Sequence, residues 1–142
     1  MTDIKHFVGI NAPAKTVYNA ITEQKGLSSW WTNDTIARPE IGFVNEFKFG
    51  ERYHNKMKVT KLEKKKLVCR DCIGGDKEWI GTEIRFELEE KNGITQLMFT
   101  HANRAAQTLF YANCNFHWGG YMKSLKDYCE KGKGLPNHDK EY

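Results

Sequence analysis

The stretch that decides the fold is IGTEIRFELEEKNGITQLMFTH, residues 80–101. Side chains that suit a buried face recur at alternate positions in both halves, the period of a β-strand with one buried side. Lys91-Asn92-Gly93 stands between the halves, and an Asn-Gly pair supplies the positive φ angles of a tight turn. The stretch therefore predicts a hairpin of two antiparallel strands. Its inward set is Ile80, Thr82, Ile84, Phe86 and Leu88, then Thr95, Leu97, Phe99 and His101.

The same alternation recurs upstream of this hairpin. Residues 4–10 alternate into a first strand. Pro13 then opens a helix, because proline is favoured at the first helical position, where its missing N–H needs no partner. Gly26 separates this helix from a second short helical segment around Trp30. Further strand-like runs follow at residues 41–49, 57–59 and 67–73.

Downstream of the hairpin the period changes. Apolar side chains fall three or four positions apart, which is one stripe of an α-helix. Lys131-Gly132 supplies a basic last turn and a glycine C-cap. A helix of roughly 20 residues is about 30 Å long, enough to cross a sheet. The stripe consists of Phe110, Cys114, Trp118, Tyr121, Leu125 and Tyr128.

These elements predict an α+β fold. An antiparallel sheet with one apolar face needs a cover, and the C-terminal helix is the element large enough to provide it. We expect a curved antiparallel sheet of about six to seven strands around this helix, with two short helices after the first strand. We expect one domain over residues 1–142, with a core at about 4–132 and a tail at 133–142 that is loose after Gly134.

Composition excludes several classes of protein. The chain of 142 residues carries a formal net charge of +4, and its lysines cluster around residues 56–66. A nucleic-acid-binding face would concentrate more charge, interleaved with aromatic side chains, so no nucleic-acid partner is expected. The absence of a long apolar run predicts no membrane insertion. The first residues show no signal-peptide pattern, and we expect a cytoplasmic protein.

The cysteines do not predict a metal or redox centre. Cys69 and Cys72 have the spacing of such a motif, but residues three apart on a strand face opposite sides. The sequence also contains no phosphate-binding loop, nucleophile elbow or metal triad. We therefore expect no metal and no cofactor.

Several segments, in their order and spacing, form a pattern that is specific to one family. They are APAKTVYNAIT at 12–22, LSSWW at 27–31, EWIGTEIRFEL at 78–88, TQLMFTH at 95–101, WGGY at 118–121, LK at 125–126 and GKGLP at 132–136. With these segments the chain resembles the family homologous to the C-terminal domain of the activator of the ninety-kilodalton heat-shock protein's ATPase, within the START-like (SRPBCC, birch-pollen-allergen-like) superfamily. The resemblance implies a helix-grip fold with a cavity between the sheet and the long helix.

The strand registers and the helical stripe predict which side chains line this cavity. Aromatic rings dominate the set, with two imidazoles and a phenol as polar anchors, a composition typical of small-molecule sites. The plain alternative is a solid aromatic core. The predicted lining is Trp30, Phe47, Phe49, Met57, Phe86, Phe99, His101, His117, Trp118 and Tyr121.

Two positions stay open at this stage. Alternation places Asp71 on the face of Leu67, Cys69 and Ile73, where a cavity-facing carboxylate would be a candidate acid or base; a strand end that twists out to water is the alternative. Alternation places Trp79 outside the sheet, whereas a bulge at Gly81 would turn it inward.

Three functions follow as hypotheses. The first is a binder of a small hydrophobic or amphipathic molecule in the cavity. The second is a cochaperone-like regulator of a chaperone ATPase, which acts through its surface. The third is an enzyme of the cyclase or hydratase type, with Asp71, His101, His117 and Tyr121 as candidate acids and bases. Both a monomer and a homodimer are compatible with the sequence.

Overall fold

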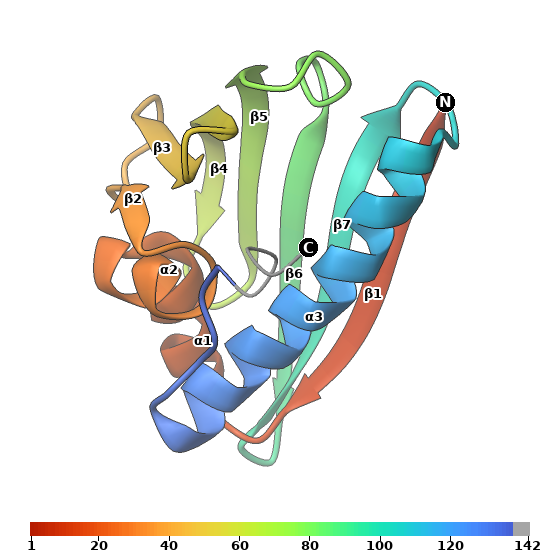
Figure 1. The fold of residues 1–142 in the computed structure, drawn as a ribbon. Helices are drawn as coiled ribbons and strands as arrows, with labels where there is room; N and C mark the ends of the chain where they lie inside the picture. The colour runs from red at the N-terminus through yellow and green to blue at the C-terminus, as the bar shows by residue number, and fades with distance from the viewer. Residues whose placement is uncertain (138–142) are drawn as a thin grey trace.

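The computed structural model describes residues 1–137. Seven strands and three helices follow one another along the chain (Figure 1). The elements are β1 (Thr2–Ile10), α1 (Ala14–Thr22), α2 (Gln24–Trp30), β2 (Asp34–Ile36), β3 (Val44–Phe49), β4 (Tyr53–Glu63), β5 (Leu67–Gly74), β6 (Glu83–Lys91), β7 (Ile94–Arg104) and α3 (Leu109–Lys131).

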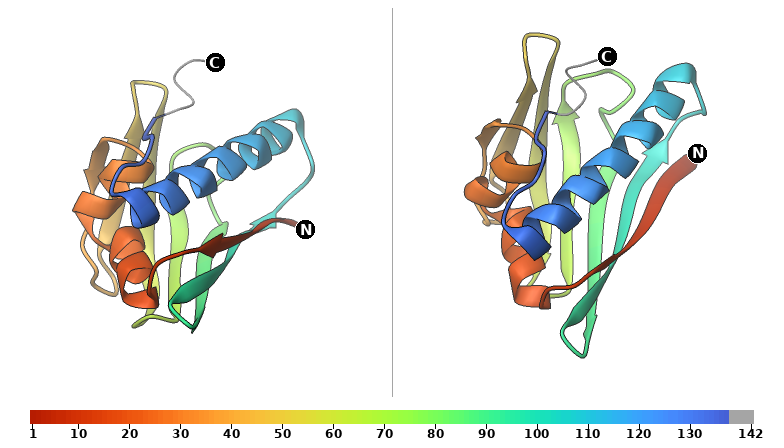
Figure 2. Two further views of the ribbon diagram at one scale, coloured as in Figure 1. Left: turned by 90° about the horizontal axis from the view of Figure 1, so that it is seen from below. Right: turned by 60° about the horizontal axis from the view of Figure 1, so that its bottom comes forward.

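All seven strands form one antiparallel sheet in the order β1-β7-β6-β5-β4-β3-β2. The predicted hairpin is the β6–β7 pair, which runs in continuous register from Lys91 opposite Ile94 to Glu83 opposite Ala102. The sheet curves around α3, which crosses its concave side diagonally, while α1 and α2 lie beside the end of α3 that carries its C-terminus (Figure 2). This is the helix-grip fold that the sequence predicts.

The long helix has a signal at each end. The Thr108 hydroxyl accepts a hydrogen bond from the Tyr111 N–H at 3.0 Å, so Thr108 is the N-cap. Gly132 ends the helix at φ 80°, a left-handed angle that favours glycine. Between these ends the predicted stripe faces the sheet, with Cys114, Trp118 and Leu125 buried.

The inward phase predicted for β5 is wrong. Val68, Arg70 and Cys72 face the core, whereas Ile73 is 49% exposed and Asp71 is exposed on the outer face. The reason is Arg70, whose Nη2 donates to the Ile21 carbonyl at 2.7 Å, at the C-terminal end of α1. Burial lowers the pKa of Arg70 to about 10, so it stays charged at neutral pH.

Two other expectations need correction. Ile80 is 51% exposed and precedes β6, because residues 75–81 form a loop. The predicted tail is not loose as far as Asn137, which is buried. Its N–H donates to the Trp31 carbonyl at 2.8 Å, and its side-chain amide contacts Asn33 and Thr32. The rest of the predicted tail, residues 138–142, lies outside the described residues.

Candidate functional site

A cleft lies between the first half of α3, the β3–β4 hairpin and the loop after β5. Its open volume is about 60 Å³. A water molecule takes up about 30 Å³ of liquid, whereas pockets for drug-sized ligands measure roughly 300–1,000 Å³. The cleft as it stands therefore holds a small chemical group rather than a whole ligand. Its lining consists of Trp31, Phe49, Tyr53, Asn55, Asp76, Trp79, Phe110, Asn113, Cys114, His117, Trp118 and Tyr121.

Aromatic side chains make up seven of these twelve lining residues. Trp118 forms the centre, with its ring 4.4 Å from Phe99 beneath it and 5.2 Å from Trp31 at its side, measured between ring centroids. Phe49 and Tyr121 stack at 6.1 Å. Rings in offset or edge contact stabilise one another beyond their burial, so these contacts stabilise the walls of the cleft.

The polar side chains of the cleft come from three different elements. Asn55 lies on β4, Asp76 on the loop after β5, and Asn113 and His117 on α3. Asp76 Oδ1 accepts a hydrogen bond from the Glu78 N–H at 2.8 Å, which orders the loop. A mostly apolar cleft with a few polar groups is the usual composition of a ligand site.

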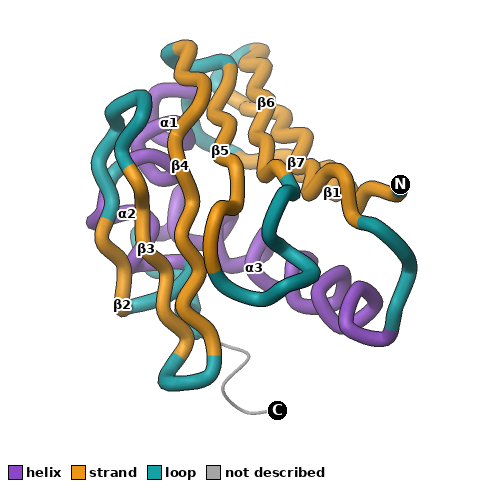
Figure 3. Tube along the Cα trace, turned by 90° about the horizontal axis from the view of Figure 1, so that it is seen from above, coloured by secondary structure: helices purple, strands orange, loops and turns teal. Residues whose placement is uncertain are grey.

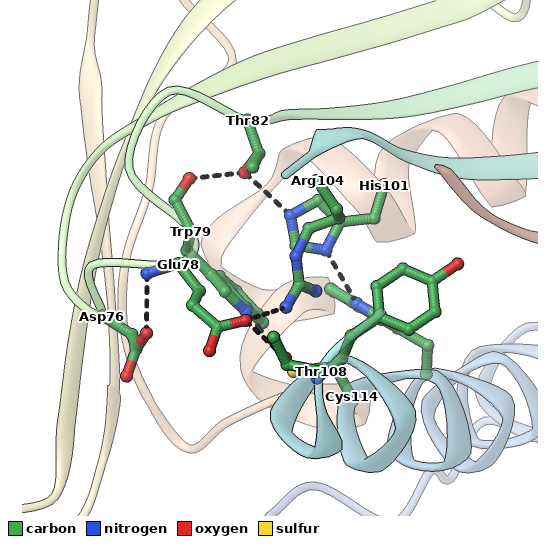
Figure 4. A network of polar contacts seen from close by, with 10 residues as sticks. Asp76, Glu78, Trp79, Thr82, His101, Arg104, Thr108 and Cys114 are labelled. Atoms are coloured by element: carbon green, nitrogen blue, oxygen red, sulfur yellow. Dashed lines mark hydrogen bonds and ion pairs between the residues drawn. The ribbon is translucent and has the colours of Figure 1, made fainter. Parts of the chain in front are cut away.

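His101 lies behind the cleft rather than in it, and it is fully buried. The Trp118 indole N–H donates to His101 Nδ1 at 3.2 Å, so Nδ1 carries no proton. On the other side of the ring, Nε2 lies 2.8 Å from the Thr82 hydroxyl oxygen. This hydroxyl donates its proton to the Trp79 carbonyl and therefore accepts a hydrogen bond from Nε2 (Figure 4). His101 is therefore neutral and protonated at Nε2. Burial, reinforced by the positive charge of Arg104, lowers the pKa of His101 to about 3.

The loop after β5 closes one end of the cleft and reaches toward α3 (Figure 3). Glu78 Oε1 accepts a hydrogen bond from the Thr108 hydroxyl at 2.7 Å and lies 3.5 Å from Nη2 of the buried Arg104. The neighbouring Trp79 points inward and its Nε1–H donates to Cys114 Sγ at 3.4 Å. The sequence left open whether Trp79 faces outward or inward, and in the structure it faces inward. Gly81, at φ 89°, belongs to this loop and not to a bulge within β6.

The predicted lining residues divide into two layers. Phe49, His117, Trp118 and Tyr121 line the cleft. His101 and the other five predicted residues pack behind it, because the bulky rings of α2 and α3 fill the concave side of the sheet. These five are Trp30, Phe47, Met57, Phe86 and Phe99.

Sequence reasoning missed most of the outer part of the cleft. Phe110 and Cys114 carried a usable signal, because both lie on the helical stripe. Trp31 lies next to the predicted Trp30, and the helical phase of so short a segment does not distinguish the two. Of the remaining missed residues, Asn113 is a polar residue of α3 beside that stripe, and the others lie at the start of β4 or in the loop, where periodicity carries no information. These remaining residues are Tyr53, Asn55, Asp76, Trp79 and Asn113.

Of the candidate acids and bases, His117 and Tyr121 line the same cleft, whereas Asp71 and His101 lie outside it. Asp71 lies on the outer face of the sheet opposite Glu83, whereas His101 pairs with the inward Ile84. His117 lines the cleft together with Trp118, whereas His101 is buried behind the cleft, where it accepts a hydrogen bond from Trp118. Cys69 and Cys72 are both buried on opposite faces of β5, and burial raises the pKa of the Cys72 thiol to about 11. Within residues 1–137 no three His, Cys, Asp or Glu side chains gather to hold a metal ion.

Residues 11–130 match the family model described as activator of Hsp90 ATPase homolog 1-like protein. The chain belongs to this family. Among solved structures, the Aha1 dimer from Colwellia psychrerythraea is 41% identical to this family member, with a TM-score of 0.86 over 94% of this chain and 100% of that one. No curated protein matches the chain.

More distant structures share the fold with this member of the activator of Hsp90 ATPase homolog 1-like family. A Staphylococcus saprophyticus protein is 18% identical, with a TM-score of 0.78 over 94% of this chain and 96% of that one. A putative protein of the dynemicin biosynthetic locus is also 18% identical, with a TM-score of 0.77. That match covers 93% of this chain and 48% of that one, so this chain spans about half the length of that protein. Among residues 1–137, none of the helices is both long and apolar enough to cross a membrane.

Proposed function

We propose that the chain binds a small hydrophobic or amphipathic molecule, with the aromatic cleft as its binding site. The observation that supports this function is the composition of the cleft, with seven aromatic side chains and four polar ones around Cys114. The fold supports it as well, since its concave side can enclose a ligand between sheet and helix.

The volume of the cleft limits what can enter. About 60 Å³ accepts the end of a ligand, for example one ring edge or a short alkyl group. The remainder of the ligand lies across the rim, where Tyr53 and Phe110 form a tilted ring pair at 6.2 Å and Asn113 is exposed. An amphipathic molecule suits this geometry, because its apolar end lies inside and its polar end faces water.

A blocking variant tests the proposal. Asn113→Trp places an indole at the rim from an exposed helix position, so it fills the cleft without disturbing the core. Asn115→Trp is the matched control, since Asn115 is exposed on the same helix but does not line the cleft. We expect the fluorescent probe 1-anilinonaphthalene-8-sulfonate to bind the wild type and Asn115→Trp, and to bind Asn113→Trp at least about tenfold more weakly. Equal binding by both variants would place the probe elsewhere and refute the cleft as the site.

A second candidate function is regulation of a chaperone ATPase, and family membership favours it. A surface for this role runs along β4, where Lys56, Lys58 and Lys61 are exposed, into the turn at residues 64–66. Within residues 1–137 none of these lysines forms an ion pair. Capture of the host chaperone that weakens between 50 and 300 mM salt, and is lost in the variant Lys56→Glu/Lys58→Glu, would support this function. Capture that the double variant retains would refute this surface.

We also propose that the chain forms a homodimer, as the Colwellia psychrerythraea relative does by its description. The 41% identity over nearly the whole chain supports this proposal. Light scattering behind size exclusion is expected to give twice the mass of one chain at micromolar concentration. A mass equal to one chain at every concentration would contradict it.

A further inference from the structure

The loop at residues 75–81 is bounded by two glycines that adopt backbone angles unfavourable for other residues. Gly75 has φ 120° and Gly81 has φ 89°. A side chain on Gly75 would collide with Asn55, whose Oδ1 lies 2.3 Å from the position of an added Cβ. Glycines at both ends allow a segment to change its backbone angles at little cost, so this loop has the geometry of a hinged element.

One carboxylate fastens the middle of the loop to α3. Glu78 Oε1 accepts from the Thr108 hydroxyl at 2.7 Å and lies 3.5 Å from the guanidinium of Arg104. Arg104 is 1% exposed, and its guanidinium lies over the rings of Phe110 and Tyr111 at 5.8 and 5.3 Å. This latch joins the loop to a fixed point at the first turn of the helix (Figure 4).

Trp79 occupies its place in the manner of a bound aromatic ligand. Its indole lies nearly parallel to Trp118, at 16° and 5.9 Å between centroids. Its plane stands at 81° to the His101 ring, 4.8 Å away, and its N–H donates to Cys114 Sγ. Trp79 belongs to the loop, so these three contacts are available to another flat ring whenever the loop moves away.

We infer that residues 75–81 are a lid, and that the space beneath it is a binding site for a planar aromatic molecule with an N–H or O–H donor. This inference rests on the proposed function, because it names the ligand class of the same cleft. The lid opens at Gly75 and Gly81 and takes Trp79 out of its place, which adds the volume of an indole to the cleft. The ligand then stacks on Trp118 and donates to Cys114 Sγ.

Amide hydrogen exchange tests the lid without any ligand. The Gly81 N–H donates to the Cys72 carbonyl and the Thr82 N–H donates to the Trp79 carbonyl in the closed loop, so each of these hydrogen bonds joins the loop to a residue outside it. Glu78→Gln weakens the latch, and Gly81→Ala disfavours the closed backbone. The space around Gly81 is open, so strain at its positive φ is the effect of this change. Loss of a hydrogen bond to a charged group corresponds to roughly tenfold or more in an opening equilibrium. We expect both variants to accelerate exchange at residues 81 and 82 by about that factor.

Each variant has a matched control. Gly42 has φ 90° and open space around it, as Gly81 does, but lies before β3, so Gly42→Ala should leave exchange at residues 81 and 82 unchanged. Glu87 pairs with Arg85 on β6, and Glu87→Gln should also have no effect there. If Glu78→Gln and Gly81→Ala exchange at these amides no faster than the controls, residues 75–81 are not a lid.

Binding of indole itself tests the ligand class. Apparent affinity rises in proportion to the fraction of molecules in the binding-competent state, so both lid variants should bind indole about tenfold more tightly than the wild type. Faster exchange with no gain in indole affinity would overturn the inferred site beneath the lid. If Asn113→Trp loses anilinonaphthalene binding but the lid variants change neither exchange nor indole binding, residues 75–81 are not a lid. The proposed function would then still hold. A third outcome is faster exchange in the lid variants while Asn113→Trp binds indole and anilinonaphthalene sulfonate as the wild type does. This outcome would refute the cleft as the binding site.

Discussion

At the scale of single residues, the partners of His101 fix its protonation state. Trp118 can only donate and Thr82 has one proton, already used by the Trp79 carbonyl, so the direction of each hydrogen bond in the chain is determined. The imidazole therefore serves as a neutral connector between α3, the lid and the sheet. A group held in this way positions Trp118 and Trp79 and does not exchange protons with a substrate.

This arrangement predicts a loss of stability in acid. His101 titrates near pH 3 when folded and near 6.5 when unfolded, so between these values the unfolded chain binds a proton that the native chain does not. Above pH 6.5 His101 does not reduce the free energy of unfolding. Below pH 6.5 the free energy of unfolding falls by about 1.4 kcal/mol per pH unit, because the unfolded chain takes up this proton. Urea unfolding from pH 7 to 4 should show a smaller slope against pH for His101→Gln than for the wild type. Equal slopes would mean that His101 is not held neutral.

The wrong phase at Asp71 has a physical cause at the same scale. Alternation placed Asp71 on the face of Leu67 and Ile73, whereas Arg70 is the residue of β5 whose charged side chain faces the core. Its guanidinium lies 5.9 Å from the Phe47 ring and donates to a helix carbonyl, a partner more than forty positions away in the chain. Such a partner exists once the fold has formed, so a sequence pattern cannot reveal it.

At the scale of elements, the start of α1 depends on a distant carboxylate. Pro13 at the N-cap offers no side-chain hydrogen bond, and the Ala14 N–H donates instead to Glu90 Oε1 on β6 at 2.7 Å. Loss of a helix cap typically costs about 0.5–2 kcal/mol. Glu90→Ala should lower the free energy of unfolding by that amount in urea. Glu89→Ala is the control, because its exposed pair with Lys91 should contribute less than about 0.5 kcal/mol; equal losses would argue against a capping role.

The segment after α3 is the other element that depends on distant contacts. The Asn137 backbone N–H donates to Trp31, and its side chain forms two more hydrogen bonds, with Asn33 and Thr32. Removal of this side chain leaves its two buried partners unsatisfied, at roughly 1–3 kcal/mol each. We expect Asn137→Ala to lower the free energy of unfolding by at least that much, whereas Leu135→Ala, at a side chain 66% exposed, should change it little. Equal free energies of unfolding for Asn137→Ala and the wild type would show that the Asn137 side chain contributes no stability.

Elements with a strong period were predictable from sequence, and elements without one were not. The β6–β7 hairpin and α3 each repeat their pattern over many residues, so single exceptions do not hide it. β2 has only three residues, and no residue of the lid belongs to a strand or a helix. Neither segment therefore shows a periodic pattern. The candidate site lies largely where α3 meets these irregular segments, which explains why its inner layer was predicted and its rim was not.

At the scale of the whole molecule, aromatic side chains fill the concave side of the sheet. Trp30 and Trp31, stacked at 5.9 Å, enter this side from the end of α2, and Trp118 fills its centre from α3. The aromatic cleft lies at the end of the concave side near the lid. Ligand binding there needs either a small inserted group or movement of the lid, and both depend on the same walls.

Native mass spectrometry of the protein purified from its own host tests the central claim most directly, with the denatured mass as reference. The account predicts a stoichiometric extra mass that disappears on denaturation. The same extra mass should be present in Asn115→Trp and absent in Asn113→Trp. An extra mass that Asn113→Trp retains, or a bare wild-type chain that also fails to bind indole and anilinonaphthalene sulfonate, would contradict the claim that the aromatic cleft is a binding site.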